Sequence, residues 1–265
     1  MIWAPRRELL LPHGRRTGPG GRSRMHANNV RGPAAAGGGG DSLFANVKFL
    51  LLPAGTQGGS PNATDTTGKT ITWAGNAQID LTDTYPAVKL DGTGDYGLTE
   101  DSADLIVPAS TEFCFEIWAK CVDATGHGTL TGTPSFFAAN GGFFWAASHS
   151  SVGNKHMIAA SGWEGFPGSL VEASDRADNA YHAFCVERDG ANLVRLYVDG
   201  AVVDSATISG GLTGTLTSTP LSIGNELAGF STEMKGSIYG MRLTVGVTRY
   251  DGAYTPITPD AIPTS

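Results

Sequence analysis

Carboxylates on neighbouring strand positions are the first residues of this chain that could do chemistry. Glycoside hydrolysis needs two of them, ~5 Å apart for retention or roughly 6.5–9.5 Å apart for inversion. Glu187 and Asp189 are two residues apart in CVERDG, so they could share one face of a strand. However, Asp189-Gly190 is typical of the turn after a strand, where Asp is favoured for backbone reasons. We therefore predict two solvated turn acids, no catalytic residues and no enzymatic activity.

Other titratable groups give no stronger catalytic pattern. Glu116 stands without a second acid in FCFEIWAKC, where an exposed pair with Lys120 is expected. The six histidines show no metal-binding spacing such as HExxH, and His182, before a core strand, is expected to be structural. The chain has only three cysteines, and an odd number cannot all pair, so a disulfide scaffold is not expected. We expect buried, unpaired thiols instead.

Large aromatic residues on glycine-rich stretches point instead to sugar recognition. A sugar site needs an exposed aromatic face and a few fixed polar groups. The segments NGGFFWAASHS (140–150), SGWEGFPG (161–168) and NELAGFSTE (225–233) offer both. The glycan-binding candidates in them are Trp145, Trp163, Phe166, Asn225 and Phe230. The alternative is that these side chains pack between sheets or against other subunits.

The candidate residues must be positioned by short strands. About a dozen apolar segments are separated by turn signals, and no segment shows a helical pattern. In the segment 113–121, Phe113, Phe115 and Ile117 fall on one face, which we predict to be the core face. The segment 192–207 predicts a hairpin with a type I′ turn at Asp199-Gly200. The fold class predicted for residues 41–265 is all-β, a two-sheet antiparallel jelly-roll sandwich.

Residues 1–40 are predicted to form an extended basic arm. They hold seven arginines and one acid, a net charge of about +6, whereas the whole chain carries −7, so residues 41–265 carry about −13. We expect the arm to anchor the protein to an acidic shell rather than to nucleic acid. The anchoring residues would be Arg6, Arg7, Arg15, Arg16, Arg22, Arg24 and Arg31. Neither a membrane span nor a standard secretory signal is expected, because apolar runs are short.

Four segments in order resemble a known family: FCFEIWAK, YHAFCVERDGANLVRLYVDGAVV, PLSIGN and KGSIYGMRLTVGVTRY. Together they resemble the laminin-G-like, concanavalin-A-like jelly roll, over most of residues 43–259. With LFANVKFLLLPAGTQG in front and a GVTRY…YTP ending, the variant resembles domains of tailed-bacteriophage structural proteins. The resemblance implies a non-enzymatic virion surface protein of capsid decoration or fibre type. Its partners would be capsid or tail subunits, further copies of itself and cell-surface glycans. The alternative is a polysaccharide-binding lectin-like module or a glucanase-like enzyme.

The resemblance carries two further expectations. The ending GVTRYDGAYTPITP (246–259) would pack back across the sandwich edge as a structural closure, with Arg249 and Tyr250 as a clip. Many laminin-G-like domains also bind calcium, and Asp91 and Asp95 match the front half of that site. The chain has Tyr239-Gly240 where the family often carries an acidic pair, so the alternative is that Asp91 only stabilises its own turn.

Overall fold

The computed structural model describes residues 40–108, 111–122, 128–132, 142–149, 155–161, 169–207, 220–225 and 233–265. Contacts divide the chain into Met1–Ala34 and Ala35–Ser265, and all the strands given below belong to the second unit. The basic arm and its seven arginines lie outside the described residues. None of the described helices is long and apolar enough to cross a membrane.

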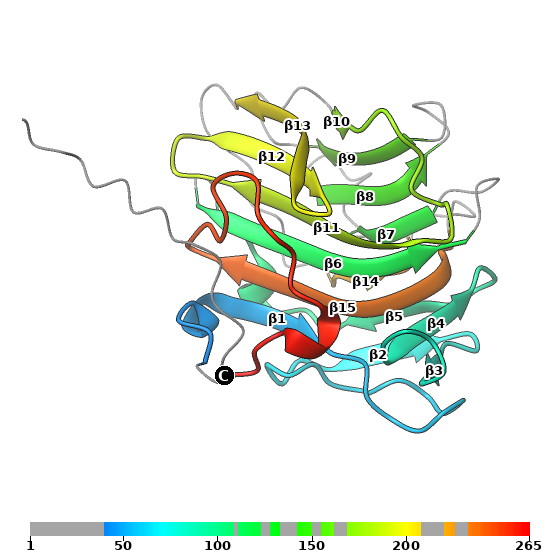
Figure 1. Ribbon diagram of the computed structural model, residues 1–265. Helices are drawn as coiled ribbons and strands as arrows, with labels where there is room; N and C mark the ends of the chain where they lie inside the picture. Colours follow the sequence, from blue (N-terminus) through cyan, green and yellow to red (C-terminus); the bar gives the residue numbers. More distant parts are fainter. Residues whose placement is uncertain are drawn as a thin grey trace, which may run out of the picture. The chain divides into compact units, whose positions relative to one another are not determined.

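One sheet of the sandwich has eight strands in the described part, all paired antiparallel (Figure 1). Strand β1 (Val47–Leu51) pairs with β15 beside the main order. That main order is β13 (Ala201–Thr207), β12 (Leu193–Val198), β11 (Tyr181–Arg188), β6 (Phe113–Cys121), β15 (Lys235–Val245), β4 (Ala87–Asp91) and β3 (Gln78–Asp80).

The second sheet has seven strands in the described part and is also antiparallel. Its order is β10 (Ser169–Val171), β9 (Lys155–Ser161), β8 (Gly142–His149), β7 (Gly128–Gly132), β14 (Ser222–Ile223), β5 (Tyr96–Thr99) and β2 (Ile71–Ala74). The described helices are single 3-10 turns: η1 (Phe44–Asn46), η2 (Ala103–Leu105) and η5 (Pro259–Ala261). The predicted all-β jelly-roll sandwich is confirmed.

Two turns show how the local sequence sets the topology. The hairpin of β12 and β13 closes through Asp199 and Gly200, whose φ angles are 50° and 81°, as the type I′ prediction requires. The turn LDGTGDY instead links the two sheets, because β4 belongs to the eight-stranded sheet and β5 to the seven-stranded one. That turn therefore carries the chain across the sandwich and does not close a hairpin.

The core between the sheets contains the predicted face of β6. Phe113, Phe115 and Ile117 are buried there with side chains from both sheets, among them Trp145 of β8 and Ile223 of β14. The predicted register of this strand is confirmed. The opposite face of β6 was expected to be largely exposed, yet Glu116 and Trp118 on it are also buried. Something other than the second sheet must therefore cover this outer face.

Candidate functional site

The C-terminal segment, residues 246–262, covers the outer face of the eight-stranded sheet. It leaves β15, passes in front of β6 and β11, and returns across β15 to η5 (Figure 1). The Tyr254 N–H donates to the Gly200 carbonyl (2.9 Å), and the Trp118 indole N–H donates to the Ile257 carbonyl (2.9 Å). A Cβ at Gly200 would lie 1.9 Å from the Tyr254 carbonyl oxygen, so the close approach needs glycine. The segment thus closes a sheet face, whereas the sequence predicted closure of an edge.

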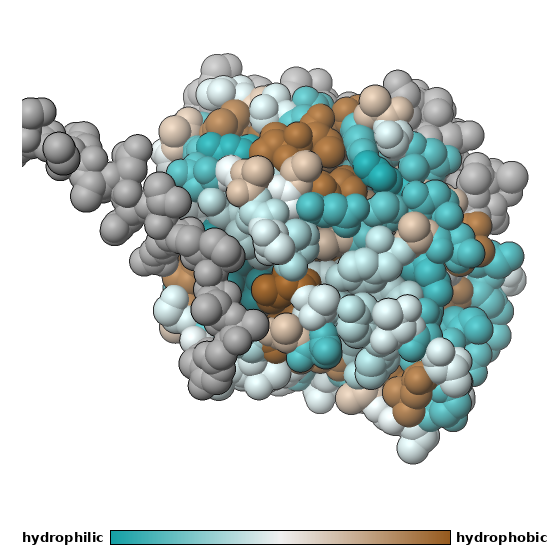
Figure 2. All heavy atoms as spheres, in the orientation of Figure 1, coloured by the Kyte–Doolittle hydropathy of each residue, from teal (hydrophilic) through white to brown (hydrophobic). Residues whose placement is uncertain are grey.

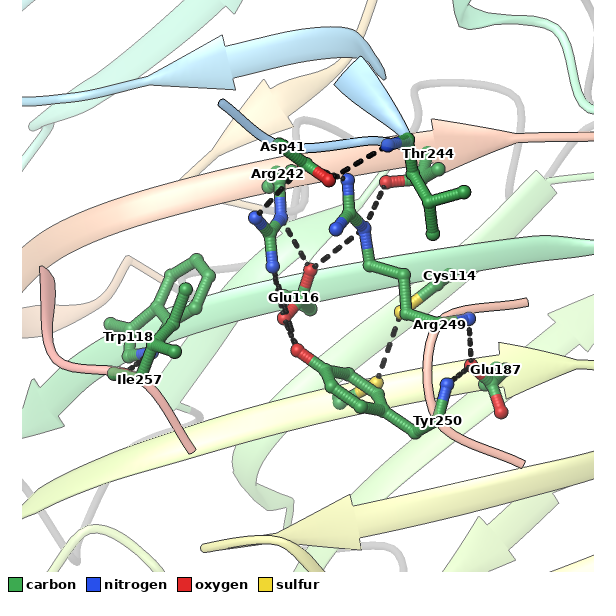
Figure 3. Close-up of polar contacts among 12 residues, drawn as sticks. Asp41, Cys114, Glu116, Trp118, Glu187, Arg242, Thr244, Arg249, Tyr250 and Ile257 are labelled. Carbon is green, nitrogen blue, oxygen red and sulfur yellow. Dashed lines mark hydrogen bonds and ion pairs between the residues drawn. The ribbon is translucent and has the colours of Figure 1, made fainter. Parts of the chain in front are cut away.

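A buried ion pair lies beneath this segment (Figure 3). The Arg242 guanidinium holds Glu116 through two hydrogen bonds, Nε to Oε2 (2.6 Å) and Nη2 to Oε1 (2.9 Å). Both side chains are at most 2% exposed, and the Tyr250 hydroxyl also donates to Glu116. Burial alone would lower the pKa of Arg242, but the Glu116 charge holds that pKa above its ordinary value. The predicted exposed pair of Glu116 with Lys120 is therefore wrong.

Arg249 joins this pair to the first residues of the sandwich. Its Nη2 lies 2.6 Å from Asp41 Oδ2, and its Nε donates to the Thr244 hydroxyl (2.7 Å). Although burial acts to raise the pKa of Asp41, the hydrogen bond from Arg249 helps to hold that pKa below its usual range. The Asp41 N–H donates to the Ser265 carbonyl (2.7 Å), so the two ends of the sandwich are fastened together.

Glu187 is the second strand carboxylate used by the C-terminal segment. It is fully buried and accepts the backbone N–H groups of Arg249 (2.7 Å), Tyr250 (2.8 Å) and Asp251 (2.9 Å). Burial raises the pKa of Glu187, and these three hydrogen bonds oppose that rise. The prediction that Glu187 is a solvated turn acid is wrong, because residues more than sixty positions away in the sequence cover it.

Asp189 behaves as the sequence predicted for a turn. Its Oδ1 accepts the N–H groups of Ala191 (2.9 Å) and Leu193 (3.0 Å), and Arg195 lies 2.9 Å from its other oxygen. Glu116, Glu187 and Asp189 are therefore each engaged in structural contacts. The arrangement can brace a sheet face, but it presents no pair of free carboxylates among these residues to a substrate.

Sequence reasoning missed a cluster of three tyrosines on the same outer face. The ring centroids of Tyr85 and Tyr181 are 5.8 Å apart, and those of Tyr181 and Tyr239 are 5.5 Å apart. Tyr85 and Tyr181 are partly exposed. Their positions are about a hundred residues apart and neither follows a glycine-rich signal, so only the folded sheet brings them together. Partly exposed rings of this kind can stack on a sugar or on a protein partner.

A charged pair supports the tyrosine cluster. Asp83 accepts hydrogen bonds from Lys120, the Ser237 hydroxyl (3.2 Å) and the Tyr239 hydroxyl (2.9 Å). Burial acts to raise the pKa of Asp83, but the hydrogen bond from Lys120 and the others lower this pKa to about 2. Lys120→Asp should therefore destabilise the domain, because the change would place two carboxylates side by side.

The aromatic sugar-binding candidates are only partly within the described residues. Trp145 is 0% exposed on β8, and its indole N–H donates to His156 Nε2 (2.8 Å). The prediction of an exposed stacking face at Trp145 is wrong, because Trp145 belongs to strand β8 and its side chain is buried in the core between the sheets. Asn225 follows β14 and is buried, and its backbone carbonyl accepts the Ser222 hydroxyl. Trp163, Phe166 and Phe230 lie outside the described residues.

His156 and His182, whose rings both lie near that of Phe184, have opposite electrostatic settings. Burial lowers the pKa of His156, which is consistent with a neutral ring that accepts from Trp145 and donates from Nδ1 to Glu172 (3.2 Å). In contrast, hydrogen bonding to Asp199 raises the pKa of His182. Its Nδ1 lies 2.7 Å from Asp199 and its Nε2 lies 3.1 Å from Asp178. His182 therefore braces the β12–β13 turn.

The expected calcium ligands serve the backbone of their own turn. Asp95 is 1% exposed, and its two oxygens accept the N–H groups of Asn76 (2.6 Å) and Asp91 (2.8 Å). Asp91 accepts from the Asn76 side chain (2.9 Å) and from the Thr93 N–H (2.8 Å). No group of three or more His, Cys, Asp or Glu side chains in the described part is arranged to hold a metal ion. These contacts fit the alternative of turn stabilisation.

Comparisons with known proteins agree with this architecture. Residues 91–246 match the family described as the concanavalin A-like lectin/glucanases superfamily, and the chain belongs to that superfamily. A search of curated proteins finds no match.

Solved structures show the same fold at low sequence identity. Domain 4 of AbnA, a GH43 extracellular arabinanase from Geobacillus stearothermophilus solved with arabinotriose, has a TM-score of 0.52 and 18% identity, over 76% of this chain and 91% of that one. The binding domain of botulinum neurotoxin DC in complex with SialylT has a TM-score of 0.56 and 12% identity, over 83% of this chain and 51% of that one. The binding domain of Paraclostridial Mosquitocidal Protein 1 has a TM-score of 0.53 with the same identity and coverage. At such identities the likeness establishes the fold alone.

Proposed function

We propose that the chain is a non-enzymatic surface protein of a virus particle, of capsid decoration or fibre type, whose jelly roll is displayed outward and binds glycans. Its partners would be capsid or tail subunits and further copies of the same chain. The non-enzymatic part rests on the hydrogen bonds that Glu116 and Glu187 accept from the C-terminal segment and, for Glu116, from Arg242. A glycosidase needs such carboxylates free at a set spacing, and these two are held by arginine and backbone N–H groups.

Three features support the display role. The front segment and the GVTRY…YTP ending resemble tailed-bacteriophage structural domains. The ion network ties Asp41, the residue that directly follows the predicted arm, to Arg249 and Arg242. The arm, at about +6, also carries the charge opposite to that of the remaining chain.

Glycan binding is supported by the superfamily and by the partly exposed residues Tyr85 and Tyr181. The outer face is mostly hydrophilic, with hydrophobic surface in separate patches (Figure 2). Such a surface suits a polar ligand held by a few aromatic contacts better than a large apolar partner. The second candidate is a lectin-like module that binds polysaccharide without belonging to a virion. The arabinanase domain solved with arabinotriose and the neurotoxin binding domain solved with SialylT favour it as an analogy.

One set of sugar assays distinguishes an enzyme from a binding protein. The full chain is incubated with laminarin, arabinotriose and a sialylated oligosaccharide, and both bound sugar and released reducing ends are measured. We expect binding without release. Loss of binding in Trp163→Ala or Tyr181→Ala, with Tyr96→Ala on the opposite sheet as control, would locate the site. Release of reducing ends that disappears in Glu187→Gln would show that the chain is a glycosidase.

The anchoring role of the arm is tested with undecorated particles. We expect residues 41–265 to fold alone, because the described strands lie there, and to bind particles at least about tenfold more weakly than the full chain. Binding of the full chain should also weaken as salt is raised. Equal binding by the folded truncated protein would assign attachment to the sandwich instead.

A further inference from the structure

Two cysteines meet beneath the C-terminal segment. Cys114 on β6 and Cys185 on β11 lie on the outer face of the eight-stranded sheet, and their Sγ atoms are 3.4 Å apart. Both thiols are free and 0% exposed. They pack with Tyr197 against Tyr250 and Tyr254, whose rings stack 3.5 Å apart. Two sulfur atoms in contact need to approach by only about 1.4 Å to reach the ~2.05 Å of a disulfide.

The third cysteine provides a built-in comparison. Cys121 lies on the same strand as Cys114 but on its opposite face, within the core between the two sheets. Successive residues of a strand point to opposite faces, and Cys114 and Cys121 are an odd number of positions apart, so Cys121 cannot reach either of the other thiols while the sheet is intact. Any native intrachain bond must therefore join Cys114 to Cys185.

We infer that Cys114 and Cys185 form an oxidation site, which closes as an intrachain disulfide when the C-terminal segment lifts from the sheet. The inference does not depend on glycan binding or on a role in a virion.

Oxidation requires a thiol–disulfide exchange partner, such as oxidised glutathione. One cysteine thiolate attacks a sulfur of that disulfide and releases one glutathione thiolate. The second cysteine thiolate then attacks the mixed disulfide and releases the other. The chain loses two protons and two electrons, and the oxidant becomes two thiols.

The closed structure opposes this reaction. Burial, with the Glu116 and Glu187 carboxylates nearby, raises the pKa of Cys185 to about 11. The pKa of Cys114 is raised well above its usual value by the same burial and by Cys185 itself. Since the thiolate is the nucleophile, neither sulfur reacts while the tyrosines cover it. Opening of residues 246–262 would admit both water and oxidant.

The pairing register predicts an easily reduced bond. Cys185 lies opposite Glu116, and Cys114 lies opposite Glu187, so the two cysteines are diagonal neighbours. Diagonal positions are farther apart than directly opposed ones, and drawing them together strains the disulfide. Strained disulfides have more oxidising potentials, so the bond should break again under a mild excess of thiol.

The test uses the full chain with oxidised glutathione at mildly alkaline pH, with and without urea below the unfolding transition. We expect a mass loss of two hydrogen atoms and a linked peptide pair containing Cys114 and Cys185. Tyr254→Ala removes a ring that covers the two thiols, so the C-terminal segment should open more often and the loss of two hydrogen atoms should be about tenfold faster or more. The control Tyr96→Ala removes a similarly exposed ring from the other sheet and should leave the rate unchanged.

Cys114→Ser and Cys185→Ser should each abolish the mass loss, whereas Cys121→Ser should retain it. The inference is wrong if neither the wild type nor Tyr254→Ala loses two hydrogen atoms in sub-denaturing urea. It is also wrong if the linked peptides contain Cys121.

Discussion

Substituting Glu116 by Gln removes one charge from the most buried ion pair of the outer sheet face. The change preserves the size of the side chain and the carbonyl that accepts from Arg242. It leaves the Arg242 guanidinium, 2% exposed, without its bidentate carboxylate. The nearest remaining carboxylate in the described network is that of Asp41, 3.6 Å from Arg242 Nη1.

The expected cost follows from that remaining partner. Removing one member of a buried pair costs about 3–5 kcal/mol, because the other charge stays buried. Since Asp41 still compensates part of the Arg242 charge, we expect a loss near the lower limit, about 3 kcal/mol in the free energy of unfolding. For a domain of this size that corresponds to a fall in Tm of about 6–12 °C.

Urea unfolding of both proteins measures the loss directly, as a lower midpoint at an unchanged m value. Glu100→Gln is the matched control, because Glu100 is exposed and its change should stay within about 0.5 kcal/mol. The double variant Glu116→Leu with Arg242→Met removes both charges and should recover much of the stability. A Glu116→Gln protein as stable as the Glu100→Gln control would refute the view that this network holds the C-terminal segment.

Two further predictions concern the core and pH. Ile117→Asp should leave the domain unfolded in circular dichroism, because it buries an unpaired charge between the sheets. The control Thr72→Asp, on the exposed side of β2, should fold. If both variants fold, the assigned strand register is wrong. The pKa of His182 is raised mainly by its hydrogen bond to Asp199, so its contribution to stability is complete below the ordinary value of about 6.5 and is lost as pH rises through the folded value. Urea midpoints between about pH 6 and pH 9 should therefore fall in the wild type and fall less in His182→Gln, and parallel curves would refute the assignment.

Local signals in the sequence were sufficient for the strands and their register. Alternation over 113–121 correctly placed Ile117 in the core, and Asp199-Gly200 correctly predicted the hairpin turn. These features depend on periodicity two and on the φ preference of a two-residue turn, both of which can be read over a few residues.

The coverage of the outer face could not be predicted in the same way. Glu116 and Arg242 are separated by 126 residues, so nothing near Glu116 indicates that it is buried. For Trp145 the sequence predicted exposure where the structure shows burial. Nearby glycines suggested a loop, whereas its hydrogen-bond partner, His156, lies on the neighbouring strand. The resemblance did predict that the C-terminal ending closes the sandwich, and the structure corrects where it does so.

Attachment to a virus particle can be measured by protein mass spectrometry of purified particles. The particles would come from cells that carry the gene for this chain in its natural setting. We expect peptides from residues 41–265 in a fixed ratio to the capsid or tail subunits, retained after further purification. Particles with full coverage of their capsid and tail subunits but without peptides of this chain would contradict it.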